Sequence, residues 1–514
     1  MNRGGVALAV AAVVVEAGCV LVWALSPRLT SIYNAEYPAA VFARVPALLG
    51  LDQLVLRGLG PLGEPAADPA GMVARLEVGL ALLSLGYAGG LLAAHPRHRP
   101  ATWPVVAGAF VFRLTLWSLP GLFSTDIFSY VMYGRIAAVH AANPYIQPPA
   151  DFASDPFLAW VFPFWRDQPS VYGPAWTDLS WLLSLLTGTL DNLGQVATYR
   201  LALVVCDTAT LAVLWWLLGR LQPCDRPRCF LVYAWNPLVL FDLSANAHND
   251  GPMLALLLLG FAPLVSTREP AGARWLVAIG ASALGGLVKY ASGVAALMLT
   301  TSFVARATCW RGRAARLGLA LAVGLALALG LAWPWLQTPE ALAALAGAAG
   351  GRLVLNYAPD VVAAFAAERL DLAVPAARAW THALARAAFG IYLVWELSRL
   401  WPVARRGGRE ALLATIRASA RALLLLPLLV LTWVWSWYFS WPLALATLLG
   451  WSSGLARVVV AYTLVAPPIV YAHQYLGDQL PAAFVLLLAL GVPALALTTR
   501  GALWARRVAA EPGR

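Results

Sequence analysis

The chain has 514 residues, of which 61% are hydrophobic and 12% are charged, with a mean hydropathy of +0.71 and a formal net charge of +11. A soluble globular protein carries about 25% charged and about 45–50% apolar residues. The composition therefore excludes a water-soluble enzyme, a disordered chain, a collagen-like fibre and a small disulfide scaffold. It indicates an all-α polytopic membrane protein.

The basic residues are almost all arginines, and Lys289 is the only lysine. This bias is typical of high-GC codon usage, so we do not interpret it as nucleic-acid binding. Five cysteines are present, and no histidine or further cysteine accompanies Cys224 and Cys229 at zinc-binding spacing. We therefore expect free thiols and no metal site.

Apolar runs long enough to cross a bilayer, about 20 residues each, recur along the chain. The first, Val6 to Leu25, is not followed by a small-residue cleavage site, so we expect an uncleaved span. Residues 175–190 are shorter, contain Asp178, and are expected to form a juxtamembrane or half-inserted helix. We predict 14 full spans in a single transmembrane domain over residues 1–514. The others begin near Met72, Trp103, Tyr199, Phe230, Pro252, Trp275, Ala291, Leu317, Leu384, Ala411, Pro442, Val458 and Pro481.

Charges are divided between alternate loops. Clusters around Arg97, Arg226, Arg313 and Arg406 predict cytoplasmic loops, because basic residues concentrate on that side of a membrane. The intervening loops carry most of the acidic residues and are expected to face outward, with both termini inside. Three outer segments, about 27–71, 123–176 and 337–383, are long enough to be functional.

Nucleotide-binding glycine loops and an HExxH motif are missing from the sequence, which argues against an ATP-driven pump and a zinc protease. Polar clusters at predicted outer helix ends remain. Asp126 follows an apolar run, and it can either cap a helix or serve as a general base close to the bilayer.

Two further polar clusters are expected at the same face. His248, Asn249 and Asp250 can cap a helix or bind a sugar or phosphate. Lys289 lies between two apolar runs, where it can extend towards the interface or act as the counter-ion of a lipid phosphate.

Aromatic residues accompany these clusters. Tyr172-Gly173-Pro174 has the composition of a turn. The run from Trp433 to Pro442 is typical of an interfacial aromatic belt, and its rings could also stack on sugars.

Taken in order, these motifs resemble those of the polyprenol-phosphate-mannose-dependent α-1,6-mannosyltransferases, actinobacterial enzymes of the GT-C superfamily. The resemblance covers residues 123 to about 300 and a late Trp-Tyr element. Its elements are Phe123–Tyr130, Gly134-Arg135, Asn143-Pro144-Tyr145, Tyr172-Gly173-Pro174, Asn236-Pro237, His248-Asn249-Asp250, Val288-Lys289, Trp437-Tyr438 and Trp441-Pro442.

The resemblance implies a GT-C-like bundle in a bacterial cytoplasmic membrane with its active site facing outward. It implies transfer of a hexose, expected to be mannose, from a polyprenyl-phosphate donor to a glycan or glycolipid acceptor. Inversion at the anomeric carbon is implied, and no cofactor is expected. Asp126 is the expected catalytic base. The expected donor- or acceptor-binding residues are Tyr130, Arg135, Tyr145, Tyr172, His248, Asn249, Asp250, Lys289, Tyr290, Trp437 and Tyr438.

A lipid-linked sugar flippase or secondary transporter is the alternative. Such a protein is expected to carry charged groups at mid-bilayer, broken helices and paired repeats. Here the polar clusters gather at one predicted face, which favours an enzyme.

Overall fold

A computed structural model describes residues 3–30, 34–60, 69–96, 102–265, 271–348 and 357–477. Every regular element within these ranges is a helix, so the predicted all-α fold class is confirmed. The apolar run expected near Pro481 lies outside the described residues. All five cysteines are described, and all are free.

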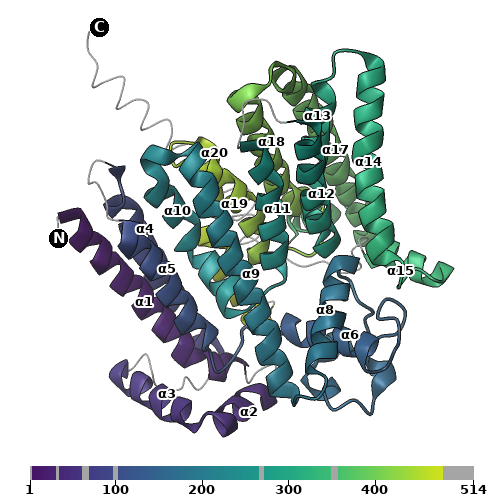
Figure 1. The fold of residues 1–514 in the computed structure, drawn as a ribbon. Coiled ribbons are helices and arrows are strands. Elements are labelled where there is room, and N and C mark those ends of the chain that lie inside the picture. Colours follow the sequence, from purple (N-terminus) through teal and green to yellow (C-terminus); the bar gives the residue numbers. More distant parts are fainter. Residues whose placement is uncertain are drawn as a thin grey trace.

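The long helices form one bundle, in which the first, central and late parts of the chain lie side by side (Figure 1). The first group packs α1 against α4 and α5. The central group contains α9 to α11, and the third contains α12 to α14, α17 and α18. α19 packs against α18, and α20 packs against α19 and α4. The bounds are α1 Arg3–Thr30, α4 Pro69–Ala93, α5 Thr102–Trp117, α9 Asn192–Leu221, α10 Arg226–Ala234, α11 Asp250–Val265, α12 Gly272–Val288, α13 Gly293–Ala305, α14 Trp310–Ala332, α17 Val374–Arg406, α18 Gly408–Leu429, α19 Ser440–Leu448 and α20 Gly454–Leu476.

Shorter helices accompany this bundle, and α2, α3, α6 and α8 among them cover its lower end in Figure 1. All but α8 come from the three long segments that the sequence predicts between spans, and α8 forms where the sequence predicts a separate short helix over residues 175–190. The bounds are α2 Glu36–Arg44, α3 Pro46–Gly58, α6 Asp126–Ala138, α7 Pro163–Arg166, α8 Pro174–Thr187, α15 Pro339–Ala348 and α16 Ala358–Leu370. Short 3-10 turns at 149–152, 158–160, 223–225, 290–292 and 436–439, and a π-helical turn at 239–245, complete the described elements.

Six described helices are long and apolar enough to cross a bilayer, and a seventh candidate is the pair α2–α3, which is bent by 109°. Four shorter apolar helices lie among them: α5, α11, α12 and the 290–305 segment. The predicted count of 14 is not confirmed. The runs expected near Phe230 and Pro442 form only the short helices α10 and α19, of nine residues each. Asn236-Pro237 follows α10 and interrupts the first of these runs.

Small residues and a side-chain cap explain local features of the bundle. Gly86 lies against α1, where a Cβ would be 2.7 Å from the Val15 amide nitrogen, so only glycine permits this α1–α4 contact. Asp191 caps α9 by accepting a hydrogen bond from Gly194 N at 2.9 Å.

Two buried arginines inside the bundle have polar partners. Arg113 Nε donates to Asp207 at 2.7 Å. The sequence places Arg200 and Asp207 on one helical face as a structural pair, but they have separate partners. Arg200 bonds to Tyr37 Oη and to the carbonyls of Leu116, Leu119 and Ala245.

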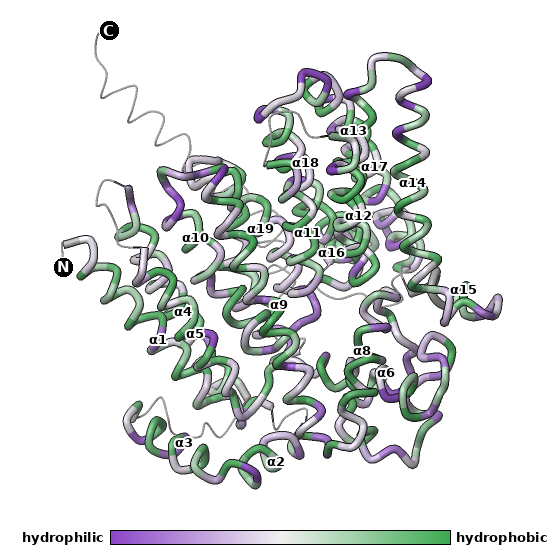
Figure 2. The backbone as a smooth tube through the Cα atoms, viewed as in Figure 1, coloured by the Kyte–Doolittle hydropathy of each residue, from purple (hydrophilic) through white to green (hydrophobic). Residues whose placement is uncertain are grey.

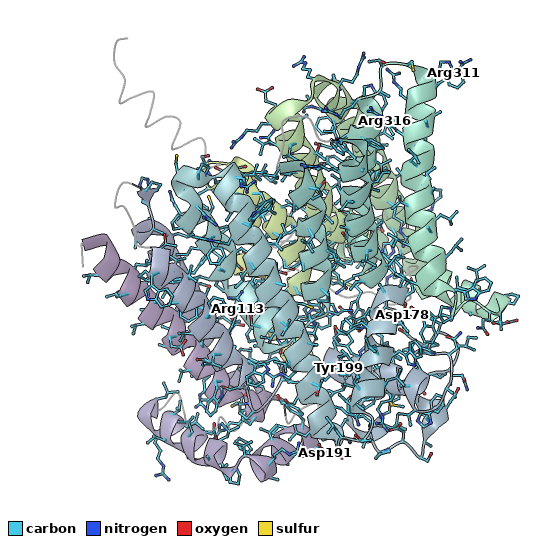
Figure 3. All side chains as sticks on the ribbon, in the orientation of Figure 1. Arg113, Asp178, Asp191, Tyr199, Arg311 and Arg316 are labelled. Atoms are coloured by element: carbon cyan, nitrogen blue, oxygen red, sulfur yellow. The ribbon has the colours of Figure 1, made fainter. Side chains whose placement is uncertain are left out.

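The two ends of the bundle differ in charge. The α13–α14 and α17–α18 turns lie at one end, with the start of α10, and α6 and α8 lie at the other (Figure 1). Figure 3 shows Arg311 and Arg316 at the first end, and Asp191 at the other. The helices between are largely hydrophobic (Figure 2). This division follows the predicted grouping of basic loops, and it separates a basic end from the end that carries α6.

Candidate active site

Four segments that are distant in sequence meet between the bundle and its capping helices. They are the first turn of α6, the residues before α11, the α12–α13 junction and the segment leading into α19. Each contributes side chains that the sequence singles out. We call Asp126, His248, Asn249, Asp250 and Lys289 the α6–α11 cluster.

Asp126 lies against a buried histidine. Its Oδ2 is 3.4 Å from Nδ1 of His248, a close contact that falls outside hydrogen-bond geometry. The His248 side chain is fully buried, whereas that of Asp126 is 19% exposed. Asp126 does not cap α6, because Thr125 holds that position and no side-chain cap forms. The carboxylate is therefore partly open to solvent and lies next to a buried imidazole without a hydrogen bond to it.

Several buried side-chain nitrogen atoms near this carboxylate have no partner among the described residues. Nε2 of His248, Nδ2 of Asn249 and Nε1 of Trp437 make no hydrogen bond with any described residue. The His248 ring stacks on Trp437, with 3.7 Å between centroids. Buried polar groups in folded proteins are nearly always paired. Three such atoms in one place indicate a site for a ligand rich in acceptor oxygens.

Lys289 is held by a buried carboxylate. Its Nζ lies 2.7 Å from Asp250 Oδ2, and Trp441 Nε1 donates to the other carboxylate oxygen. Asp250 is fully buried, and the Lys289 side chain is 17% exposed. The ammonium also lies 5.0 Å from the centre of the Tyr438 ring. Lys289 thus does not extend freely to the interface, and two of its three N–H donors remain for a ligand.

The predicted turn at Tyr172-Gly173-Pro174 lies against the end of α12. Gly173 N donates to Val288 O at 3.3 Å, and a Cβ on Gly173 would be 2.0 Å from Leu287 O. Only glycine allows this approach beside Lys289. Tyr172 packs on Tyr130, with 5.0 Å between ring centroids.

Tyr130 connects this turn to the α6–α11 cluster. Its hydroxyl donates to Asn249 Oδ1 and accepts from Asn249 N, both at 3.3 Å. Burial raises the Tyr130 pKa well above its ordinary value, an effect to which the nearby Asp126 and Asp250 add. The hydroxyl therefore remains a neutral donor that fixes the Asn249 side chain.

Two predicted binding residues, Arg135 and Tyr145, have their hydrogen-bond partners outside the cluster. Arg135 pairs with Asp155, with Nη2 and Oδ2 3.0 Å apart. Tyr145 donates to Tyr172 O at 2.9 Å and so supports the turn from behind. Tyr290 follows Lys289 and is 39% exposed. The structure brings the other predicted residues together around Asp126 and Lys289.

Sequence reasoning missed a set of residues that hold the cluster in place. Asp242 accepts hydrogen bonds from Ser436 at 2.8 Å and from Tyr471 at 2.7 Å. Asn246 accepts from Phe123 N at 2.9 Å and donates to Tyr471. Asp242 inside an apolar run was the only signal, since ionisable groups at membrane depth are costly.

The position of Gly251 along α9 indicates how deep the cluster lies in the bundle. Gly251 packs against α9 at the level of Leu203. A Cβ built on Gly251 would lie 3.6 Å from the carbonyl oxygen of Leu203. At 1.5 Å per residue, Leu203 is about 27 Å from the α9 end at Leu221 and about 17 Å from Asn192. A hydrocarbon core is about 30 Å thick. A bilayer that begins at the basic end of the bundle would therefore finish close to the cluster.

The described residues include no group of three or more histidine, cysteine, aspartate or glutamate side chains arranged to hold a metal ion.

Comparison with known proteins gives consistent matches. Residues 46–308 match the family model described as alpha-(1->6)-mannopyranosyltransferase, N-terminal domain. The alpha-(1->6)-mannopyranosyltransferase A of Mycobacterium tuberculosis is 29% identical over 192 residues, 35% of this chain and 36% of the relative. The alpha-(1->6)-mannopyranosyltransferase B of Corynebacterium glutamicum is 29% identical over 143 residues, 27% of this chain and 23% of the relative.

A probable alpha-(1->6)-mannopyranosyltransferase of Mycolicibacterium smegmatis is 29% identical over 170 residues, 29% of this chain and 27% of the relative. The matches thus span about a quarter to a third of the length of these relatives. No solved structure matches the chain.

Proposed function

Because the chain belongs to the alpha-(1->6)-mannopyranosyltransferase family, we propose that it transfers mannose from a polyprenyl-phosphate donor to a glycan or glycolipid. The observation that carries this proposal is the contact of Asp126 with buried His248, beside the buried Asn249 and Trp437 donors that have no described partner. A carboxylate next to a pocket of free donors suits a reaction in which a hydroxyl loses a proton and a phosphate leaves.

The donor phosphate binds to the side of the cluster that contains Lys289. The two remaining Lys289 N–H groups, His248 and Asn249 Nδ2 supply donors for phosphate oxygens. Each charge-assisted hydrogen bond contributes about 1.5–3 kcal/mol. The cluster lies about where a bilayer would end, so an embedded polyprenyl chain would present its phosphate at this level.

Asp126 acts as the general base. It accepts the proton of the acceptor hydroxyl while the oxygen attacks the anomeric carbon. The bond from that carbon to the phosphate breaks, and its electron pair leaves with the polyprenyl phosphate. Attack opposite the leaving group inverts the anomeric configuration. Asp250 is a poor candidate for the base, because both its oxygens are buried and paired with Lys289 and Trp441.

Incubation of the purified protein with radiolabelled polyprenyl-phosphate-mannose and a mannoside acceptor tests the proposal. We expect label in the acceptor and release of polyprenyl phosphate. The same protein in liposomes would report movement of the donor between leaflets. Movement without transfer would contradict the enzyme assignment and favour the flippase.

The outward orientation of the site is a further part of the proposal. It is supported by the basic turns at the opposite end of the bundle. Single cysteines introduced at positions 226, 313 and 406 of a cysteine-free variant should resist an impermeant thiol reagent in intact cells. Cysteines at 151 and 167 should react. Labelling of position 226 from outside would contradict the orientation.

A further inference from the structure

The turn before α6 determines where Asp126 lies. It runs from Ser118 to Thr125, between the end of α5 and Asp126 at the start of α6. The Asp126 carboxylate accepts no hydrogen bond from any described residue, and it meets His248 at 3.4 Å without one. Its position therefore follows from the backbone of this turn, because no side-chain partner of its own fixes it.

Two hydroxyl side chains of α1 hold the backbone of this turn. The Thr30 hydroxyl accepts a hydrogen bond from Leu122 N and donates one to Leu122 O at 2.5 Å. Ser26 Oγ accepts from Gly121 N at 3.1 Å. Both side chains are buried. Buried backbone groups outside regular structure need such partners, so α1 supplies hydrogen bonds that the turn cannot make within itself.

The contacts of Thr30 differ from those of other helical threonines. A helical threonine commonly bonds to the carbonyl four residues before it, as Thr198 and Thr208 of α9 do. Thr30 instead bonds to a residue 92 positions further along the chain. Gly121 permits this approach, because a Cβ on it would lie 2.3 Å from Ser26 O. The end of α1 and the turn therefore pack backbone against backbone.

The last part of the turn is held from the other side. Asn246 Oδ1 accepts from Phe123 N at 2.9 Å, and Gln474 donates to Phe123 O at 3.2 Å. Asn246 precedes His248 by two positions, and Phe123 precedes Asp126 by three. The turn is thus fixed between α1 and the segment that carries the imidazole, which explains why Asp126 and His248 meet.

We propose that Thr30 and Ser26 are positioning residues of the transfer reaction, which hold the turn so that the Asp126 carboxylate meets the acceptor hydroxyl. This inference rests on the proposed function, in which Asp126 is the base. Both residues precede residues 46–308, the part of the chain that matches the family model. A misplacement of about 1 Å in a reacting group can reduce turnover about 100-fold. Loss of the α1 contacts should therefore slow the chemical step, while donor binding at Lys289 is unchanged.

Thr30→Val tests the inference, because valine keeps the shape of the side chain and loses both hydrogen bonds. The assay uses the full-length protein, radiolabelled polyprenyl-phosphate-mannose and a mannoside acceptor. We expect kcat to fall about 10–100-fold, with a donor KM within about twofold of the wild type. Thr30→Ser keeps the hydroxyl and should retain most of the turnover. Thr208→Val is the matched control, because Thr208 bonds within α9, and its kcat should equal that of the wild type.

The loss should also depend on the Asp126 carboxylate. Thr30→Val should not reduce the residual turnover of Asp126→Asn any further, because a positioning residue acts only through the group that it places. A general loss of stability would instead lower turnover by the same factor in both backgrounds. Ser26→Ala removes one hydrogen bond and provides a second variant if Thr30→Val does not fold. Its kcat should fall about threefold to tenfold, with the same dependence on Asp126.

An unchanged kcat in folded Thr30→Val and Ser26→Ala would contradict the positioning role and leave the proposed function standing. An equal loss with and without the Asp126 carboxylate would contradict it as well. If the wild type transfers no mannose, the proposed function fails, and the positioning role fails with it.

Discussion

Two polar clusters lie on opposite faces of α6. Asp126 and Arg135 are nine positions apart, which is about half a turn in projection. Asp126 faces His248, while Arg135 faces Asp155 and Gln195. Both clusters are largely buried, and both join the helix to distant parts of the chain.

The clusters differ in how far their hydrogen bonds are completed. Asp155 accepts from Arg135, His140 and Phe157 N, and the Gln195 amide donates to Leu190 O. In the α6–α11 cluster, donors on His248 and Asn249 have no described partner. Complete pairing favours a structural role, and incomplete pairing favours a ligand site, because a buried unpaired group costs about 1–3 kcal/mol.

The strongest test of this contrast is Asp126→Asn. Asparagine keeps the shape of the side chain but cannot accept the proton at neutral pH. We expect turnover to fall by at least about 100-fold, the lower range for acid–base catalysis, with an unchanged melting temperature. Turnover is measured with the radiolabelled donor at saturation. Near-normal turnover of this variant, with an inactive Asp250→Asn, would assign the base to Asp250.

The second test is Lys289→Met, which removes the cation expected to bind the phosphate. Loss of a charge-assisted contact worth about 1.5–3 kcal/mol predicts a donor KM raised about 10–150-fold. Because Asp250 would be left buried and unpaired, the single variant should also be less stable. The double variant Lys289→Met/Asp250→Asn should recover stability without recovering the donor KM. An unchanged donor KM would contradict phosphate binding by Lys289 and would leave it only a structural role in its ion pair with Asp250.

On the opposite face, Asp155→Asn should affect stability rather than chemistry. It leaves the Arg135 guanidinium buried without its counter-ion, which costs about 3 kcal/mol or more. We expect a lower melting temperature in detergent and a donor KM equal to that of the wild type. A raised donor KM in a variant that still folds would contradict this structural role and would indicate that Arg135 and Asp155 contribute to donor binding.

The smallest effect is a pH dependence of that stability difference. Burial opposes ionisation of Asp155, but hydrogen bonds from Arg135, His140 and Phe157 N outweigh it and lower the pKa of the carboxyl. The ordinary value is about 3.9. The ionised group therefore stabilises the fold above about pH 4, and this contribution is lost as the pH falls through the lowered pKa. The melting-temperature gap between wild type and Asp155→Asn should be constant at neutral pH and narrow below about pH 4. A gap that widens on acidification would contradict the pairing.

Sequence analysis identified the fold class and much of the candidate site through local signals. Apolar runs of membrane length predict helices without reference to their neighbours. The motifs containing Asp126, His248, Asn249 and Lys289 are short and keep their order along the chain. Local signals did not give the number of full spans. Asn236-Pro237 interrupts one apolar run, and the residues after it form the π-helical turn that carries Asp242.

Sequence alone thus determined that this protein is a helical membrane protein with polar motifs at helix ends, because hydropathy and spacing are local properties. Only the tertiary structure decided which motifs meet. Arg135 follows Asp126 on the same helix, yet faces a different cluster, while Ser436 and Tyr471 reach Asp242 from more than 190 residues away. Such contacts depend on how helices pack against one another. The same packing decides which buried donors find partners and which remain for a substrate.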